Sequence, residues 1–167
     1  MQISRRRNQI ECHLDVPEKF IFIKALRQLE ADYRIHPEDA EEHLRSAWYS
    51  SKSQDEAGYS DDEFREWQSQ LQEIRSERLE NISHWLDRLA QGTSDLTRWE
   101  IADSEVDDLI SILNDYRLLL ALENDIGEHE MEENCFLMQD PDRRMVMIEI
   151  HVLAAFMECL IRAVEAE

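Results

Sequence analysis

Apolar residues recur along most of the chain at the three- and four-residue spacing of an α-helix, and residues 104–127 show this pattern most strongly. The apolar positions of this stretch are Val106, Leu109, Ile110, Leu113, Leu118, Leu119, Leu120, Ala121 and Leu122. A helix that is apolar on more than one face is usually buried by several neighbours. The stretch therefore predicts a central helix, capped by Ser104 and Asp107. Its basic residue, Arg117, is unexpected inside the apolar run.

Two helices are predicted in the first third of the chain. Asp15 and Glu18 have the spacing of a capping box, and Pro17 between them suits a first helical turn. They predict the start of a core helix over residues 15–35. A shorter helix is predicted over residues 37–48, because its acidic first turn complements the helix dipole.

A long helix and a last helix complete the set. Ser60 and Glu63 form a second capping box and open the long helix over residues 60–91, which Gly92 can end in a left-handed conformation. Its apolar stripe consists of Phe64, Trp67, Leu71, Ile74, Leu79, Ile82, Leu86 and Leu89. Pro141 opens the last helix. The apolar stripe of that helix consists of Ile148, Val152, Ala155, Phe156, Cys159, Leu160 and Ala163.

The first 14 residues alternate with the shorter period of a β-strand. Ile3 lies on one side of Arg6-Arg7-Asn8, and Ile10, Cys12 and Leu14 lie on the other. This pattern predicts two short strands joined by a tight turn. An isolated hairpin is only marginally stable, so the hairpin is expected to lie against a helix.

Two further segments lack a periodic pattern. Residues 50–59 are polar and contain Gly58, which predicts a loop. Residues 93–103 predict a connector that Leu96, Trp99 and Ile101 fasten to the core.

Length and composition favour one folded unit. The chain has 167 residues, 43% of them hydrophobic, which is enough for a sizeable core. Three glycines and three prolines leave few breaks for turns, so helices should dominate. We predict a mainly α, single domain over residues 1–167, with a short N-terminal β-hairpin at 1–14. The remainder, residues 15–167, is predicted to be a helical bundle of about five helices.

The charge balance narrows the choice of partners. The net charge is −20, from 18 basic and 38 acidic residues. An acidic surface repels phosphate backbones, so direct binding of nucleic acid is disfavoured, and with it a DNA-binding transcription regulator. The basic run Arg5-Arg6-Arg7 is too short to change this expectation.

Cysteine usage and hydropathy favour a cytoplasmic protein without a membrane partner. Cys12, Cys135 and Cys159 form no paired motif, as is typical of a reducing compartment. The N-terminus does not resemble a signal peptide, and no apolar run approaches the ~20 residues of a membrane span. Cys159, within the stripe of the last helix, is expected to behave as a small inert apolar residue.

The sequence shows no pattern typical of a catalytic or metal site. Glu80 and His84 lie one helical turn apart, but two ligands do not make a metal site. The acidic residues around His129 lack the glycine of a calcium-binding loop. The sequence has no nucleophile elbow, phosphate-binding loop or dinucleotide fingerprint. We predict no catalytic residue, no metal and no cofactor.

One group of polar residues is a candidate binding or structural network. Asn114 and Arg117 lie three residues apart on the central helix, so both can face the same side. A buried guanidinium needs carboxylate partners, and Asp61 or Asp62 at the start of the long helix, next to Arg65, could supply them. The network is interpreted either as an ion-pair lock between two helices or as a polar pocket for a small acid or a partner's terminus.

Two segments within this network resemble a known family. Residues 59–65, YSDDEFR, and residues 113–120, LNDYRLLL, resemble landmark segments of an uncharacterised bacterial domain-of-unknown-function family. The order of predicted elements is also similar over most of the chain. Members of that family, best populated in actinobacteria, are often encoded beside the ClpS adaptor of the Clp protease. The resemblance implies a regulatory or proteolysis-linked setting and no established catalytic role.

These patterns together favour a non-enzymatic regulatory or protein-interaction module whose protein partner is unknown. The alternative is a small-ligand-binding protein or enzyme that uses a polar pocket around Arg117. Homodimerisation through the long helix or the last helix is a further expectation. Four tryptophans could lie in the core or at an interface, with the core favoured: Trp48, Trp67, Trp85 and Trp99.

Overall fold

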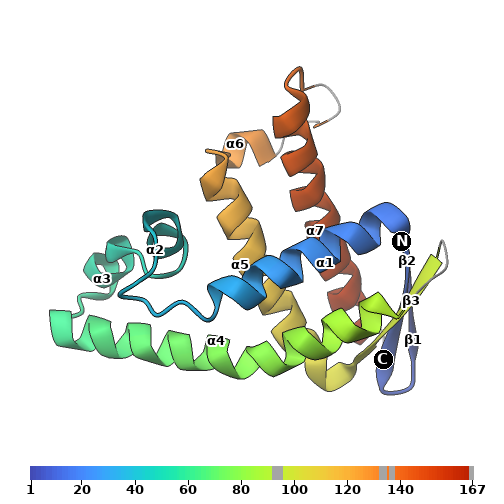
Figure 1. The fold of residues 1–167 in the computed structure, drawn as a ribbon, viewed down its shortest axis with the longest axis horizontal. Coiled ribbons are helices and arrows are strands. Elements are labelled where there is room, and N and C mark those ends of the chain that lie inside the picture. The colour runs from blue at the N-terminus through green and yellow to red at the C-terminus, as the bar shows by residue number, and fades with distance from the viewer. Residues whose placement is uncertain (92–95, 132–134, 136–137, 166–167) are drawn as a thin grey trace.

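The computed structural model describes residues 1–91, 96–131, 135 and 138–165, excluding the side chains of residues 51–53, 96, 128 and 131. The helices are α1 (Val16–Asp32), α2 (Glu42–Trp48), α3 (Ser51–Ala57), α4 (Asp61–Ala90), α5 (Val106–Glu123), α6 (Glu128–Met131) and α7 (Pro141–Glu165), with a short 3-10 turn, η1 (Asp103–Glu105), before α5. In Figure 1, α4 runs along the longest dimension, and a small sheet lies at one end. The mainly α fold predicted from the sequence is confirmed.

The sheet contains one strand more than the sequence predicted. Strands β1 (Gln2–Arg6), β2 (Gln9–Asp15) and β3 (Leu96–Ala102) pair antiparallel in the order β1-β2-β3. The predicted hairpin is confirmed, and Arg7 adopts a left-handed φ of 56° in its turn. Residues 96–102 of the predicted connector form strand β3 beside β2, which the sequence did not predict, whereas Trp99 and Ile101 fasten this segment to the core as predicted.

Two helices, α1 and α4, begin with the capping boxes that the sequence predicted. At α1, the amide of Glu18 donates to Asp15 Oδ1 at 2.9 Å, and the amide of Asp15 donates to Glu18 Oε2 at 3.0 Å. The capping box of Ser60 and Glu63 at α4 is also formed. The predicted end of α4 at Gly92 lies outside the described residues.

Three helix boundaries differ from the sequence predictions. α2 begins at Glu42 rather than near Pro37. Residues 50–59, predicted as a loop, contain α3, and Gly58 follows it with a left-handed φ of 69°. Ser104 lies within η1 and does not cap α5; instead, Glu105 Oε2 accepts a hydrogen bond from the amide of Ala102 at 2.7 Å.

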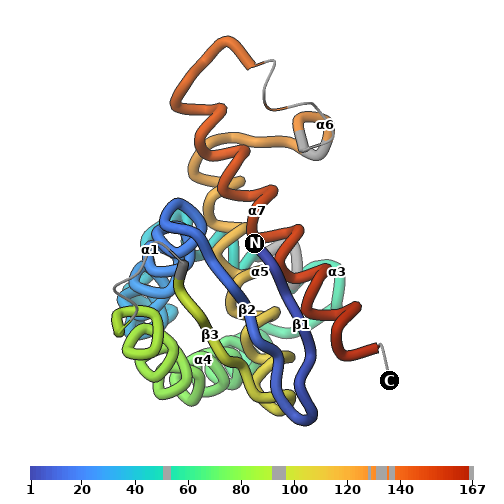
Figure 2. Tube along the Cα trace, turned by 90° about the vertical axis from the view of Figure 1, so that its right-hand side faces the viewer, coloured from blue at the N-terminus to red at the C-terminus, as the bar shows by residue number. Residues whose placement is uncertain are grey.

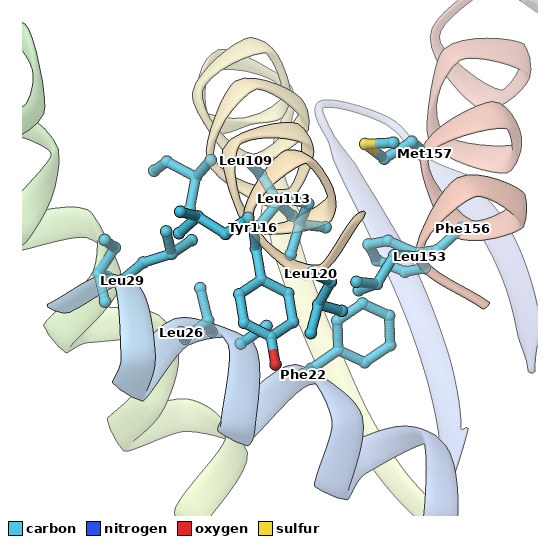
Figure 3. Close-up of a cluster of buried hydrophobic side chains, with 14 of the residues drawn as sticks. Phe22, Leu26, Leu29, Leu109, Leu113, Tyr116, Leu120, Leu153, Phe156 and Met157 are labelled. Atoms are coloured by element: carbon cyan, nitrogen blue, oxygen red, sulfur yellow. The ribbon is translucent and has the colours of Figure 1, made fainter. Parts of the chain in front are cut away.

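The core is built around α5, as predicted. Figure 3 shows side chains of α5, including Tyr116 and Leu120, between residues of α1 such as Phe22 and residues of α7 such as Leu153 and Phe156. The sheet contributes Trp99, whose ring stacks on Phe156 at a centroid distance of 5.7 Å. Helices cover one face of the sheet, because Ile10, Cys12, Leu14, Trp99 and Ile101 all point into this core.

Two apolar stripes are less buried than the sequence predicted. Trp48, Trp85 and Trp99 are buried, whereas Trp67 is only half-buried. On α7, Cys159 is exposed, although the sequence placed it within the apolar stripe of that helix. Both α4 and α7 therefore carry apolar residues that the core does not fully bury.

Candidate functional site

The structure does not assemble the polar group predicted from the sequence. Asp61 accepts a hydrogen bond from Gln54 Nε2 at 2.9 Å, and Asp62 pairs with Arg65 at 3.2 Å on the exposed first turn of α4. Asn114 is exposed on α5, and Arg117 is half-buried there. Within the described residues, no hydrogen bond or ion pair connects Arg117 to Asp61 or Asp62. The predicted lock between the start of α4 and Arg117 is wrong.

Helix geometry explains why these residues stay apart. The ion pairs that join α4 to α5 begin at Arg75, which lies 13 residues beyond Asp62. At 1.5 Å per residue, Asp62 is about 20 Å further along the helix axis. An arginine side chain on α5 cannot span that distance. Burial without an ionic partner instead lowers the pKa of Arg117, and its Nε has no hydrogen-bond partner.

An ion pair does join α4 to α5, but its cation lies on α4 and its carboxylate on α5, the reverse of the prediction. Arg75 of α4 is 6% exposed, and its Nε donates to Asp115 Oδ2 of α5 at 3.3 Å. The guanidinium carbon lies 4.5 Å from the ring centroid of Trp48 and 5.1 Å from that of Tyr49. The cation thus comes from α4, the carboxylate from α5, and the aromatic surface from the end of α2.

Two tyrosines complete the surroundings of Arg75. The Tyr33 hydroxyl donates to Asp115 Oδ2 at 2.7 Å, and the Tyr49 hydroxyl donates to Gln72 Oε1 at 2.9 Å. Burial raises the pKa of both phenols, and the nearby Asp115 carboxylate adds to the increase. Both hydroxyls therefore remain protonated near neutral pH. Asp115 accepts hydrogen bonds from both Arg75 and Tyr33, whereas Nη1 of Arg75 has no hydrogen-bond partner. Because its members come from different helices and contact one another, we interpret the Arg75 cluster as architecture that fastens α2 to α4 and α5.

A regular spacing in the sequence could have revealed this cluster. One row of buried or half-buried positions on α4 alternates steps of four and three residues: Leu71, Arg75, Arg78, Ile82, Trp85 and Leu89. Arg75 and Arg78 occupy two places in an otherwise apolar row. A charged residue at a core position predicts a carboxylate on the facing helix. Arg78 meets that expectation through Asp108 Oδ1 at 3.1 Å.

A second buried carboxylate holds α7 in place. Glu149 of α7 is 7% exposed. It accepts a hydrogen bond from the Tyr116 hydroxyl at 2.9 Å and pairs with Lys24 of α1 at 2.7 Å. The three residues tie α7 to α5 and α1 at the point where these helices meet, so this site is also structural.

The uncovered face of the sheet carries a third charged cluster. The side chain of Glu11 on β2 is 4% exposed and lies 2.8 Å from Arg98, 3.4 Å from Arg6 and 2.7 Å from His13. Burial opposes ionisation, but the hydrogen bond with His13 and the two arginines outweigh it, so the pKa of Glu11 lies below its ordinary value. Glu100 pairs with Arg98 as well, so two carboxylates, Glu11 and Glu100, offset the charges of Arg6 and Arg98 in this cluster.

The first half of α4 presents an apolar row that the chain leaves partly uncovered. Phe64 and Trp67 stack on each other at a centroid distance of 5.3 Å, and both are half-buried. Leu71 continues the row, and Ile74 is 43% exposed. Figure 1 shows this half of α4 near α2 and α3, away from the sheet and from α7.

A row of carboxylates runs beside this apolar row. Four exposed glutamates repeat at helical spacing along this side of α4: Glu63, Glu66, Glu73 and Glu77. Three of them directly precede a residue of the apolar row, and Glu77 follows Ile74 by three residues. We call the two rows together the α4 face; its residues are Phe64, Trp67, Leu71 and Ile74 with Glu63, Glu66, Glu73 and Glu77. An apolar strip with a single-sign charged border is a typical binding surface for an amphipathic segment of opposite charge.

Two features that the described residues lack bear on function. Groups of three or more His, Cys, Asp or Glu side chains that could hold a metal ion are absent from the described part of the chain. The helices in the described ranges also lack a stretch long and apolar enough to cross a membrane.

Comparison with known proteins identifies a family without an assigned role. Neither the curated proteins nor the solved structures yielded a match to the chain. A family model matches residues 1–164, which is nearly the whole sequence. The chain belongs to the family described as domain of unknown function DUF2017.

Proposed function

We propose that the protein is a non-enzymatic interaction module of the bacterial cytoplasm, and that its α4 face binds a basic, amphipathic segment of a partner protein. The observation that carries the proposal is the half-covered Phe64–Trp67 stack beside four exposed carboxylates. Aromatic residues in partly open positions are frequent anchors of protein interfaces. Of the four tryptophans, Trp67 is the one that the core does not enclose.

The charges favour this kind of partner over others. With a net charge of −20, the protein repels acidic partners and steers basic ones towards its surface. Charge attraction alone would not be specific, because acidic residues are spread over the whole chain. The apolar row supplies the specificity, since only a segment with apolar and basic residues at helical spacing contacts both rows at once.

A lysine-leucine peptide that forms an amphipathic helix serves as the first probe. Calorimetric titration should give binding that weakens with salt and is weakened roughly tenfold or more by Trp67→Ser, which corresponds to about 1.4 kcal/mol or more. Phe20→Ser removes an aromatic side chain that is 68% exposed on α1 and is the matched control. If both variants bind the peptide equally well, the attraction is only non-specific charge and the proposal fails.

A role in regulation is the finer part of the proposal. The family resemblance seen in the sequence implies a setting near regulated proteolysis, where an interaction module would bring a partner to or away from a protease. Affinity capture from the source cell tests this, with Trp67→Ser and Arg117→Ala as comparison variants. A partner lost with Trp67→Ser but kept with Arg117→Ala, and bound through a basic segment, supports the proposal.

The second candidate function is binding of a small acid at Arg117. One observation favours it: the Nε of Arg117 is buried and has no partner, so a ligand carboxylate could satisfy it. The other members of the predicted pocket lie elsewhere, which leaves Arg117 as the single binding group. A screen of carboxylic acids for thermal stabilisation tests this candidate, and stabilisation that persists in Arg117→Met would contradict it.

A further inference from the structure

Beside its buried side, α7 carries a second apolar row, of which Ile148 and Ala163 also pack against the core. Its residues recur at the three- and four-residue spacing of a coiled-coil seam: Met145, Ile148, Val152, Ala155, Cys159 and Ala163. Met145 is 64% exposed, Ala155 and Cys159 are exposed, and the others are half-buried. The buried side of the same helix is a separate row that includes Ile150, Leu153, Met157 and Leu160. We call the exposed set the outer row of α7.

Neighbouring elements widen this row into a surface. A groove of about 360 Å³ lies between β1 and α7, and Met1, Ile3, Cys159 and Ala163 are among its lining residues. Figure 2 shows α7 running beside β1 in this region. The C-terminal end of the outer row, at Cys159 and Ala163, therefore adjoins strand β1.

The first two turns of α1 add two exposed apolar side chains, Val16 and Phe20. Phe20 is 68% exposed and Val16, one turn earlier, is 56% exposed. α1 is fastened to α7 nearby through the Lys24–Glu149 pair at 2.7 Å. The surface thus combines one long apolar row with an exposed aromatic ring beside it.

The charges of this surface identify the occupant. Along residues 143–163 the carboxylates are Glu149, which is buried and paired with Lys24, and Glu158, which pairs with Arg162. A surface with little net charge in a chain of net charge −20 repels its own copy least, whereas the α4 face would place two rows of carboxylates against each other. Like charges of that kind disfavour a dimer through α4, so α7 is the helix through which we expect two copies to meet.

We propose that the outer row of α7 binds the same row of a second copy of this chain, in an antiparallel arrangement about a two-fold axis near Val152 and Ala155. The spacing allows side chains of one row to fit between those of the other, as in a coiled coil. In a two-fold dimer both copies use the same surface, so a single self-complementary row on each chain is sufficient to form the interface. The small side chains of Ala155, Cys159 and Ala163 allow the helices to approach closely.

The size of the row indicates that α1 takes part. Residues 145–163 span about 27 Å, which at a helix diameter near 10 Å gives roughly 270 Å² in projection. A small stable interface buries about 600 Å² on each partner. Val16 and Phe20 must therefore contribute, and the dimer should be of modest, roughly micromolar affinity.

Analytical ultracentrifugation of the full chain tests the proposal. The expected mass at roughly 100 µM, far above a micromolar Kd, approaches twice the chain mass of 19.9 kDa. Ala155→Glu should weaken the dimer at least tenfold, because it places two carboxylates near the axis. Since Ala155 is exposed and glutamate favours helices, the monomer should keep its circular dichroism spectrum and its Tm. Phe20→Ser should weaken the dimer by a smaller factor.

Controls separate this proposal from its alternatives. Ile161→Glu changes a residue that is 43% exposed on α7 but off the outer row, and it should leave the dimer intact. Trp67→Ser should also leave the dimer intact, so a failure of the α4 proposal does not affect this one. A monomer at the highest concentration, a dimer insensitive to Ala155→Glu, or a dimer lost equally with Ile161→Glu would overturn the proposal. Binding of a monomeric chain to phosphatidylglycerol vesicles, abolished by Ala155→Glu, would overturn it as well and assign the surface to a membrane.

Discussion

The substitution Asp115→Asn tests whether the Arg75 cluster is the structural lock between α4 and α5. Asparagine keeps the shape of the side chain and removes the negative charge. In the folded protein Arg75 is 6% exposed, and its Nη1 already lacks a hydrogen-bond partner. Asp115 supplies the carboxylate for this guanidinium, 3.3 Å from Nε. The variant therefore leaves a buried cation without its counter-charge.

The expected loss can be estimated from the burial of the two groups. Removing one partner of a buried ion pair typically costs about 3–5 kcal/mol. We expect about 3 kcal/mol, the lower end of that range, because the Asp115 side chain is 17% exposed and water can reach it. The contact between Arg75 and the Trp48 ring, 4.5 Å from its centroid, remains in the variant. For a domain of this size, such a loss lowers Tm by roughly 6–12 °C.

Urea unfolding followed by circular dichroism measures the effect. Arg75→Met and the double variant complete a double-mutant cycle, and the double variant should lose clearly less than the sum of the two single losses. Asp62→Asn breaks an exposed pair with Arg65 in the first turn of α4 and should lower the unfolding free energy by less than about 1 kcal/mol. An Asp115→Asn variant as stable as Asp62→Asn, or a cycle that is strictly additive, would refute the idea of a buried lock.

Two other predictions follow from the buried carboxylate of β2 and from the cysteines. Because the pKa of Glu11 is depressed in the fold, its contribution to stability is present above about pH 4.5 and is lost as the pH falls through the folded-state pKa. The difference in Tm between wild type and Glu11→Gln should therefore be largest near neutral pH and should disappear at acidic pH. A difference that does not change with pH would argue against the ion pairs of Glu11 as its cause. In dilute solution, Cys159 should react with a thiol reagent while Cys12 does not, because Cys12 is buried and its pKa is raised to about 12. The fast phase of labelling should vanish in Cys159→Ser, and a fast phase that persists there would contradict the exposure assigned to the two thiols.

Local patterns predicted the elements whose determinants lie close together in the sequence. The capping boxes that begin at Asp15 and Ser60 need only four consecutive residues each, and both form. The hairpin over residues 1–14 likewise depends on neighbouring residues, and its strands and turn are confirmed. The stripe of α5 predicted a central helix, because residues apolar on several faces must be enclosed by several elements.

Long-range pairing was harder to predict. Residues 97, 99 and 101 alternate inward as a strand requires, but their partner β2 lies about ninety residues earlier, so the short alternating run was not distinguishable from a connector. The candidate lock failed for a related reason, since the sequence places cations and carboxylates on both α4 and α5 without showing which pairs face each other. Arg75 could have been recognised by its place in the apolar row of α4. The exposure of Trp67 depends on how far α4 extends past its neighbours, which no local pattern records.

Site-specific photo-cross-linking in the source cell tests most directly whether the α4 face is a partner-binding surface. Gln70 is exposed and continues the row of carboxylates between Glu66 and Glu73, so a photoreactive residue in its place would touch whatever covers the face. We expect an adduct from position 70 whose cross-linked segment is rich in Lys or Arg and in apolar residues. The same residue placed at Ala31, exposed on α1, should give no such adduct. An absence of adducts from position 70, or an adduct through an acidic segment, would contradict the account.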